Sequence, residues 1–336
     1  MEEKIAAARF DDAVQNLGKL TRCLNLSIST KARVQEIRLR IDKPVVLSLP
    51  EGPLFITKFG TPAVLPREGL LCASRDSIDE AFRLICECSV HSHQREIKNG
   101  FVTIRGGHRA GICGTAVTEG RTITNIRDIS SINLRIARDI KGAADGVVKA
   151  IVSHGSVCGT LIFGPPGCGK TTVLRDLARR LSLGSLFGKI HRVAVVDERG
   201  EIAATYHGKP QNDLGPCCDV LDGYPKGEGI MQAVRSLSPD VVICDEIGGE
   251  EDEKAVELSL NAGVAVIASA HAGSAAELLT RPQTARLLNS GAFKLAIKLA
   301  GKENPGKVEH VYTLESLQQF RMNYNNARIG KDIRSA

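Results

Sequence analysis

The stretch from Gly164 to Thr172 constrains the fold of this chain more than any other part of its sequence. It reads Gly-Pro-Pro-Gly-Cys-Gly-Lys-Thr-Thr, which fits the phosphate-loop pattern G-x-x-x-x-G-K-[ST]. The apolar residues Leu161–Phe163 stand before it, and the helix-like segment Val173–Arg180 follows it. In this order a glycine-rich loop can wrap its backbone N–H groups around phosphate oxygens at the start of a helix. A plain Gly/Pro turn before a helix is the alternative interpretation.

Each position of this loop can be assigned to a nucleotide. Lys170 can reach the β- and γ-phosphates of ATP, and the Thr171 hydroxyl can bind Mg²⁺. Cys168 lies where an anion is favoured, so its thiolate could form easily; a simple filling role is the alternative. The residues predicted to bind the nucleotide are Gly164, Pro165, Pro166, Gly167, Cys168, Gly169, Lys170, Thr171 and Thr172. ATP and Mg²⁺ are the predicted ligands.

Two acidic segments end apolar, β-rich runs further along the chain. Val241–Cys244 is followed by Asp245 and Glu246, and a second apolar strand runs into Asp197–Glu201. Ligands of α/β sheets bind beyond the carboxyl ends of the strands, so these carboxylates are expected beside the phosphate loop. We expect Asp245 to hold Mg²⁺ and Glu246 to orient or deprotonate the attacking water. Glu198 is a second candidate for aligning the water, and an acidic strand end or a solvated turn is the structural alternative.

A histidine ends a third apolar run, Val264–Ala270. At that place the imidazole of His271 could report on the γ-phosphate and pass its state to neighbouring elements. A hydrogen-bonded structural histidine is the alternative, and the company of the other strand-end motifs favours sensing. The sequence therefore predicts catalytic roles for Lys170, Glu198, Glu246 and His271.

Basic residues gather in the first part of the chain. Residues 1–140 hold 21 Lys and Arg against 16 Asp and Glu, whereas residues 141–336 hold 23 against 22. Such an excess can meet nucleic acid, a membrane surface, the phosphates of a nucleotide, or only solvent. Several arginines stand near the end of this part, among them Arg105, Arg109, Arg127, Arg135 and Arg138. We expect Arg135 and Arg138 to bind the nucleotide, within the subunit or from a neighbour, with surface salt bridges as the alternative.

The order of the elements predicts an α/β protein of two domains. Residues 1–30 have helical spacing, strands follow from residue 34, and Gly106-Gly107 is suited to the turn of a hairpin, so residues 1–140 are expected to form a basic α+β domain. From Thr160 onward, strands alternate with helices. This alternation predicts a mainly parallel, helix-covered sheet, the RecA-like P-loop NTPase core, over residues 141–320. Residues 321–336 are expected to form a loose tail.

The composition of the chain predicts where the protein is located and can be weighed against a competing function. The chain has no run of 18 apolar residues, and its start lacks the pattern of a signal peptide, so a cytoplasmic protein without membrane insertion is expected. A P-loop protein that binds single-stranded nucleic acid through its basic part is the competing function. With no tryptophan and 4% aromatic residues, however, the chain offers few platforms for stacking bases.

The strand-end motifs, taken together, resemble those of the secretion-type ATPases of type II and type IV secretion systems. The phosphate loop, acidic box, second carboxylate strand and histidine box of those ATPases match Gly164–Thr172, Asp197–Glu201, Ser238–Ile247 and Ala268–His271. The segments 101–114, 131–138 and 195–202 are moreover similar to the stage III sporulation AA family of endospore-forming bacteria. This similarity covers most of residues 30–320.

The resemblance implies a cytoplasmic ATPase that forms a homo-oligomer, expected to be a hexamer. It also implies membrane proteins of a sporulation channel apparatus, linking mother cell and forespore, as partners; nucleic acid is not expected to be one. The chain departs from the wider secretion family, because Asp245-Glu-Ile-Gly-Gly249 stands where that family usually has Gly-Glu-Ile-Arg-Asp. This departure leaves open whether Glu198 or Glu246 aligns the water.

Overall fold

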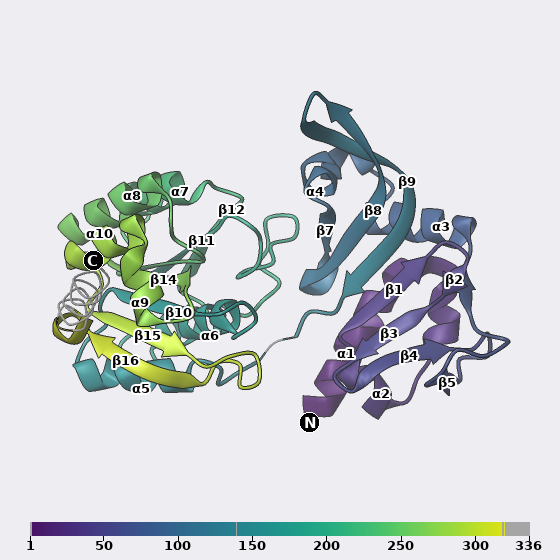
Figure 1. Ribbon diagram of the computed structural model, residues 1–336, viewed down its shortest axis with the longest axis horizontal. Helices are drawn as coiled ribbons and strands as arrows, with labels where there is room; N and C mark the ends of the chain where they lie inside the picture. Colours follow the sequence, from purple (N-terminus) through teal and green to yellow (C-terminus); the bar gives the residue numbers. More distant parts are fainter. Residues whose placement is uncertain (1, 139, 318, 320–336) are drawn as a thin grey trace, which may run out of the picture. The chain divides into compact units, whose positions relative to one another are not determined.

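The computed structural model describes residues 2–138, 140–317 and 319, which form two compact units (Figure 1). The first unit comprises Met1–Asp139 and Ala204–Gln211, and the second comprises Ile140–Ala203 and the chain from Asn212 on. The division after residue 139 falls next to the predicted boundary. Residues 204–211, predicted as part of the second domain, instead group with the first unit, where the Gln211 side chain accepts a hydrogen bond from the Gly106 N–H at 2.9 Å. The predicted tail, residues 321–336, lies outside the described residues.

Three helical segments open the first unit, where the apolar spacing of residues 1–30 predicts one or two helices. They are α1 (Glu2–Val14), the 3-10 helix η1 (Gln15–Leu24) and α2 (Ile28–Arg33). The side chain of Ser27 accepts a hydrogen bond from the Thr30 N–H and so caps α2. Helices α3 (Arg75–Ile85) and α4 (Gln94–Lys98) follow, with the short 3-10 segments η2 (Val90–His93) and η3 (Arg105–Gly107).

A seven-stranded antiparallel sheet completes the first unit, in the order β5-β4-β3-β1-β9-β8-β7. Its strands are β1 (Glu36–Arg40), β3 (Val46–Leu49), β4 (Gly52–Ile56), β5 (Pro62–Ala63), β7 (Phe101–Ile104), β8 (His108–Glu119) and β9 (Thr122–Arg135). A separate two-stranded pair joins β2 (Lys43–Pro44) to β6 (Cys72–Ala73). The chain turns between β1 and β2 at Asp42, where φ is +56°.

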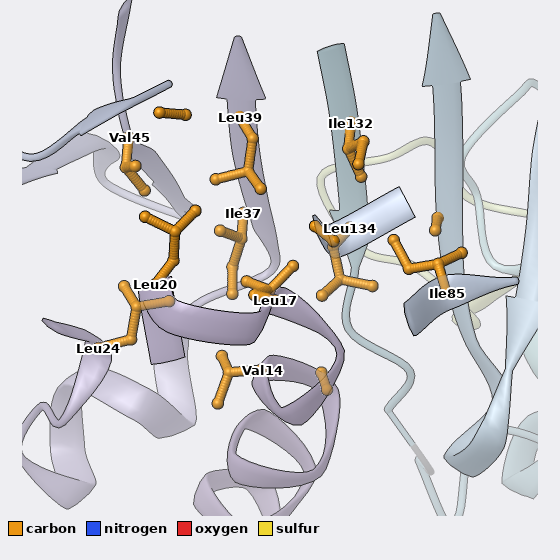
Figure 2. Close-up of a cluster of buried hydrophobic side chains, with 14 of the residues drawn as sticks. Val14, Leu17, Leu20, Leu24, Ile37, Leu39, Val45, Ile85, Ile132 and Leu134 are labelled. Carbon is orange, nitrogen blue, oxygen red and sulfur yellow. The ribbon is translucent and has the colours of Figure 1, made fainter. Parts of the chain in front are cut away.

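The core of the first unit lies between this sheet and the helices (Figure 2). Ile37 and Leu39 of β1 are fully buried, whereas Arg38 between them is only partly so, because successive side chains of a strand point to opposite faces. Figure 2 shows Leu17 of η1 beside Ile37, with Leu134 of β9 on the neighbouring strand. The apolar residues of β1 therefore mark its buried face.

The predicted hairpin turns at its two glycines. Gly106 and Gly107 both have positive φ, +83° and +75°, which residues with a Cβ rarely adopt. The strands pair at Ile104 and His108, so the loop includes Arg105 and has three residues instead of the predicted two. A Cβ on Gly106 would also lie 2.3 Å from a carboxylate oxygen of Asp12, so a side chain there would displace that carboxylate.

The second unit is built on a sheet in the order β12-β11-β13-β14-β10-β15-β16. Its strands are β10 (Thr160–Gly164), β11 (Val193–Asp197), β12 (Cys218–Asp222), β13 (Val241–Cys244), β14 (Ala265–His271), β15 (Leu295–Leu299) and β16 (Val308–Thr313). Neighbouring strands are parallel except at β15 and β16, which pair antiparallel. The prediction of a mainly parallel sheet is thus confirmed.

Helices cover both faces of this sheet. They are α5 (Asp145–His154), α6 (Lys170–Ser182), α7 (Lys226–Ser236), α8 (Glu250–Asn261), α9 (Ala275–Thr280) and α10 (Pro282–Asn289). Ile162 of β10 packs in one cluster with α5 and α6, while its neighbours Leu161 and Phe163 pack in the other with α7 to α10. A strand buried on both faces must be apolar throughout, which is why the sequence of β10 shows no alternation.

Strand order decides which chain segments meet at the carboxyl edge. Strand β14 lies between β10, which leads into the phosphate loop, and β13, which leads into Asp245 and Glu246. In the register of β10 and β14, Gly164 stands opposite His271. The topology therefore brings the histidine between the phosphate loop and the acidic strand end.

Candidate active site

The phosphate loop connects β10 to α6, and its glycines are required by its geometry. Gly167 and Gly169 have φ of +76° and +89°. A Cβ on Gly169 would lie 2.9 Å from the backbone nitrogen of Gly306, so even alanine would force the two segments apart. Helix α6 starts at Lys170 directly after the loop, which places the first N–H groups of a 13-residue helix at the predicted phosphate position.

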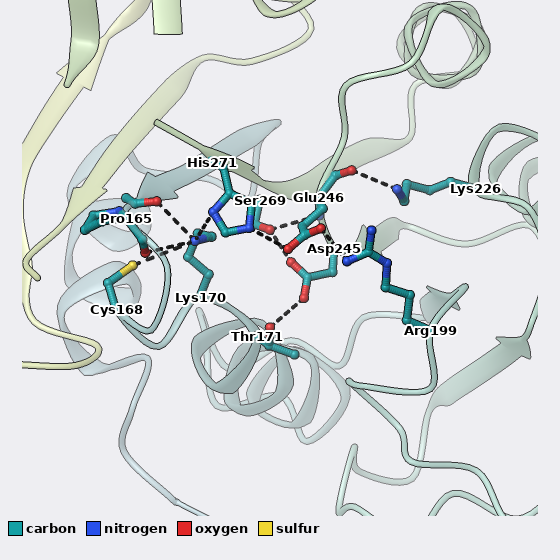
Figure 3. A network of polar contacts seen from close by, with 11 residues as sticks. Pro165, Cys168, Lys170, Thr171, Arg199, Lys226, Asp245, Glu246, Ser269 and His271 are labelled. Carbon is teal, nitrogen blue, oxygen red and sulfur yellow. Dashed lines mark hydrogen bonds and ion pairs between the residues drawn. The ribbon is translucent and has the colours of Figure 1, made fainter. Parts of the chain in front are cut away.

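Lys170 is buried, and its ammonium group contacts two carbonyl oxygens and a ring nitrogen, with the Cys168 sulfur as a more distant fourth partner (Figure 3). It donates to the carbonyl oxygens of Gly164 at 3.1 Å and Pro165 at 3.2 Å, and to Nδ1 of His271 at 3.1 Å. Since an ammonium group can only donate, Nδ1 must accept, and the ring proton lies on Nε2. That Nε2–H donates in turn to a carboxylate oxygen of Glu246 at 2.6 Å.

Thr171 and Asp245 supply oxygen atoms of the kind that Mg²⁺ prefers. The Thr171 hydroxyl donates to Asp245 Oδ2 at 2.5 Å, and the Ser269 hydroxyl donates to the other carboxylate oxygen. Neighbouring ligands of an octahedral magnesium ion are about 2.9 Å apart, because each lies about 2.0–2.1 Å from the metal. The two oxygens are close enough for one ion to bind both after a small shift, so these residues fit the predicted metal.

The backbone of Glu246 has an unusual conformation, and side chains form hydrogen bonds with both its N–H and its carbonyl. Its φ is +51°, a region that costs a residue other than glycine roughly 1 kcal/mol or more. The Glu246 N–H donates to the Ser269 hydroxyl at 3.0 Å, and its carbonyl accepts from Lys226 Nζ at 2.7 Å. One carboxylate oxygen then meets His271, and the other accepts from Arg199 at 2.7 Å. Glu246 is therefore fixed toward the phosphate loop and not toward solvent.

The acidic box after β11 divides into a structural and an exposed carboxylate. Asp197 is buried and accepts from the backbone N–H groups of Glu201, Ile202 and Ala203 at 2.9, 3.1 and 2.7 Å. Burial raises the pKa of Asp197 above its ordinary value, although these three N–H groups work to lower it. Glu198 is more exposed and pairs with Lys226 at 3.3 Å. Asp197 therefore shapes the loop, while Glu198 remains a candidate for aligning water.

A small cavity lies between the two acidic segments. Its lining includes the carboxylates of Asp197, Glu198, Asp245 and Glu246 and the cations Arg199 and Lys226. Together with the hydrogen bonds of Lys170, Thr171 and His271, this cavity shows that the phosphate loop, both acidic segments and the histidine lie at one edge of the sheet in the second unit.

Cys168 and the two predicted arginines have other partners in the structure. Cys168 is fully buried within the core beside α6, with its sulfur 4.0 Å from Lys170 Nζ. Arg135, at the end of β9 in the first unit, pairs with Glu36 at 3.3 Å. Arg138 donates to the carbonyls of Ala32 and Val34 at 3.0 and 2.9 Å, and burial lowers its pKa. A contact of these three residues with the nucleotide stays a prediction.

The sequence did not single out three residues that hold the site together. Ser269 lies two positions before His271 on β14, and the two-residue period of a strand would have placed both on the same face. Arg199 stands inside the acidic box, beside Glu198. Lys226 gives no such signal, since only the fold brings the start of α7 to this edge.

Asp176 anchors helix α6 and with it the phosphate loop. This buried carboxylate accepts from the Ala144 N–H at 3.0 Å and pairs with Arg179 at 2.6 Å and Arg180 at 3.1 Å. Burial alone would raise its pKa, but the backbone N–H and the two guanidinium groups outweigh it and lower the pKa below its ordinary value.

The free energy of unfolding should therefore depend on Asp176 in acid. A lowered pKa stabilises the folded state above the ordinary pKa near 4, and this contribution is lost as the pH falls through the folded-state pKa. Asp176→Asn cannot ionise, so we expect it to be less stable by about 3 kcal/mol at pH 7, with the gap closing below about pH 4. Urea denaturation from pH 7 to pH 3 measures this, and a gap that stays constant would contradict it.

Comparison with the sequences of known proteins places this chain in a family. Residues 12–318 match the model of the family described as Sporulation stage III, protein AA. The chain belongs to this family. The stage III sporulation protein AA of Bacillus subtilis (strain 168) is 41% identical over 279 residues, which is 83% of this chain and 86% of that protein. The family predicted from the glycine-rich hairpin and the acidic box is confirmed.

Solved structures with the same fold are secretion-type ATPases. The ATPase DotB of Yersinia pseudotuberculosis has a TM-score of 0.53 at 12% identity, covering 90% of this chain and 81% of DotB. The pilus retraction motor PilT with bound ADP has a TM-score of 0.51 at 15% identity, covering 79% of this chain and 74% of PilT. At these identities the likeness shows the fold, and it confirms the predicted RecA-like P-loop core. Among the residues described, no helix is long and apolar enough to cross a bilayer.

Proposed function

We propose that this member of the family is an ATPase that hydrolyses Mg-ATP at the edge of the second unit's sheet. One observation carries the proposal: Lys170, His271 and Glu246 form an unbroken line of hydrogen bonds, with the Thr171–Asp245 pair beside it. These residues come from two strand ends, those of β13 and β14, and from the loop helix α6. A structural carboxylate cluster would not need a buried lysine and a glycine-rich loop at its end.

The residues present can perform the steps of phosphoryl transfer. The loop N–H groups and Lys170 would bind the β- and γ-phosphates. Mg²⁺, held by Thr171 and Asp245, would neutralise the charge that develops on the phosphate oxygens. Glu246 would orient the attacking water and take its proton, because its carboxylate lies on the line that leads to Lys170. Glu198 is the second candidate for this role.

His271 couples the two ends of this line. Its Nδ1 accepts from Lys170 and its Nε2–H donates to Glu246. When a γ-phosphate takes over hydrogen bonds of the Lys170 ammonium, the ring loses its partner at Nδ1 and can shift with Glu246. Loss of the γ-phosphate would restore the original contacts, so the state of the nucleotide would reach β13 and β14.

The proposed context is a machine at a membrane during endospore formation. Membership in the sporulation family and the fold shared with DotB and PilT support it. The chain would work in the mother-cell cytoplasm as a homo-oligomer, a hexamer in this proposal, and drive a channel apparatus made of membrane proteins. Arg135 or Arg138 would approach the nucleotide from within the subunit or from its neighbour.

Phosphate release by the full-length chain tests this function. We expect release that requires Mg²⁺, stops on chelation with EDTA and rises per subunit with protein concentration as the oligomer assembles. Light scattering with a non-hydrolysable ATP analogue should report the assembled mass. A chain that neither binds a fluorescent ATP analogue nor releases phosphate at any concentration would contradict the proposal.

A further inference from the structure

A lysine outside the recognised motifs contacts both glutamates that could align the water. Lys226 is the first residue of α7, and its Nζ lies 2.7 Å from the Glu246 carbonyl oxygen and 3.3 Å from Glu198 Oε2. Its side chain is only 13% exposed. Figure 3 shows its ammonium group pointing at the backbone of Glu246 from the side opposite to Lys170.

The position of Lys226 is unfavourable by itself. The N-terminus of a helix carries a partial positive charge, so a cation is disfavoured there and an acidic residue is favoured. A buried ammonium group also loses hydration and must find partners within the protein. In this structure the partners come from the acidic box and from the strand end that carries Glu246.

The contact with Glu246 acts on its backbone. Glu246 has a positive φ, and in this conformation its carboxylate reaches His271 and Arg199. Ser269 holds the N–H on one side of the residue, and Lys226 holds the carbonyl on the other. Lys226 thus controls the direction of a side chain whose carboxylate it does not contact itself.

We propose that Lys226 is a positioning residue for ATP hydrolysis: it fixes Glu246 through the backbone and Glu198 through its carboxylate, so that both face the same small cavity. This inference rests on the proposed function. Lys226 itself does not contact the nucleotide in this proposal, because its ammonium group is already bound to the Glu246 carbonyl and the Glu198 carboxylate. Loss of Lys226 should therefore slow the chemical step and leave nucleotide binding intact.

The test replaces Lys226 by methionine, which keeps an unbranched chain of nearly the same length and removes the charge and the hydrogen bonds. A displacement of a catalytic group by about 1 Å can cost about a hundredfold in rate, so we expect kcat to fall about 10- to 100-fold. KM and the affinity for a fluorescent ATP analogue should stay within about twofold, since the phosphate loop is unchanged. Lys149→Met, an exposed lysine on α5, is the matched control and should keep the wild-type kcat.

Further variants separate positioning from a general loss of structure. Lys226→Gln, which can still donate to the Glu246 carbonyl, should fall between methionine and wild type. Combining Lys226→Met with Glu198→Gln should lower kcat by less than the product of the two single effects, since both changes break one contact. A kcat for Lys226→Met equal to that of Lys149→Met, or a loss of nucleotide affinity as large as the loss of kcat, would overturn the inference. If the wild type releases no phosphate, the proposed function fails, and the inference fails with it.

Discussion

Replacing Lys170 with alanine is expected to lower steady-state ATP hydrolysis by at least about 100-fold. The Lys170 ammonium group is buried and held by two loop carbonyls and His271, so its charge is already aimed where the phosphates are predicted to bind. Removing one preorganised donor to a developing negative charge typically costs about 10²–10³ in kcat. The substitution also removes the donor to Nδ1 of His271, so Lys170 is no longer linked through His271 to Glu246.

Phosphate release at saturating Mg-ATP measures this effect. Lys254→Ala, at an exposed position on α8, provides the control for a lost lysine and should hydrolyse ATP at the wild-type rate. Circular dichroism should show an unchanged secondary structure in both variants. Hydrolysis by Lys170→Ala within a few-fold of the wild type would show that the reaction takes place elsewhere.

Replacing Glu246 with glutamine should give the second large loss. The amide keeps the size of the side chain but is a poor base, and general-base catalysis by a positioned side chain contributes typically about 10²–10⁴. We therefore expect kcat to fall about 100- to 1,000-fold while the affinity for an ATP analogue stays within a few-fold. The amide also cannot pair with Arg199 and His271 as the carboxylate does.

The matched substitution Glu198→Gln decides between the two candidate glutamates. Glu198 lies at the same edge, but it pairs with Lys226 and has no recorded contact with His271 among the hydrogen bonds of the described residues. We expect kcat of Glu198→Gln to fall by less than about tenfold, because the substitution weakens only the ion pair with Lys226. If Glu198→Gln abolishes hydrolysis and Glu246→Gln does not, the roles are reversed and Glu246 is a structural residue.

The sequence predicts that these residues lie at one edge of the sheet because its signals are local. A glycine-rich loop needs particular residue types at fixed spacing, and a parallel strand buried on both faces reads as an apolar run that ends in polar residues. Asp245, Glu246 and His271 each stand at or just beyond such an end, so the direction of the strands alone brings them to one edge. Their placement around Lys170 depends in addition on the strand order, which puts β14 between β10 and β13.

Other parts of the fold could not be predicted in this way. Strand β12 alternates without a strong apolar run, and residues 204–211 contain nothing that marks them as part of the first unit. Contacts such as that of Gln211 with Gly106 join residues far apart in the chain. Lys226 was missed for the same reason, because only tertiary structure brings the start of α7 to the two glutamates.

A structure of the chain with Mg²⁺ and a non-hydrolysable ATP analogue tests most directly whether these segments meet at one ligand. The account predicts phosphates on the loop N–H groups and Lys170, and the metal about 2.0–2.1 Å from Thr171 Oγ1 with Asp245 in direct or water-mediated contact. Glu246 should lie within reach of a water beside the γ-phosphate. A nucleotide bound away from this loop, or a γ-phosphate with Asp245, Glu246 and His271 all beyond the reach of a bridging water, would contradict it.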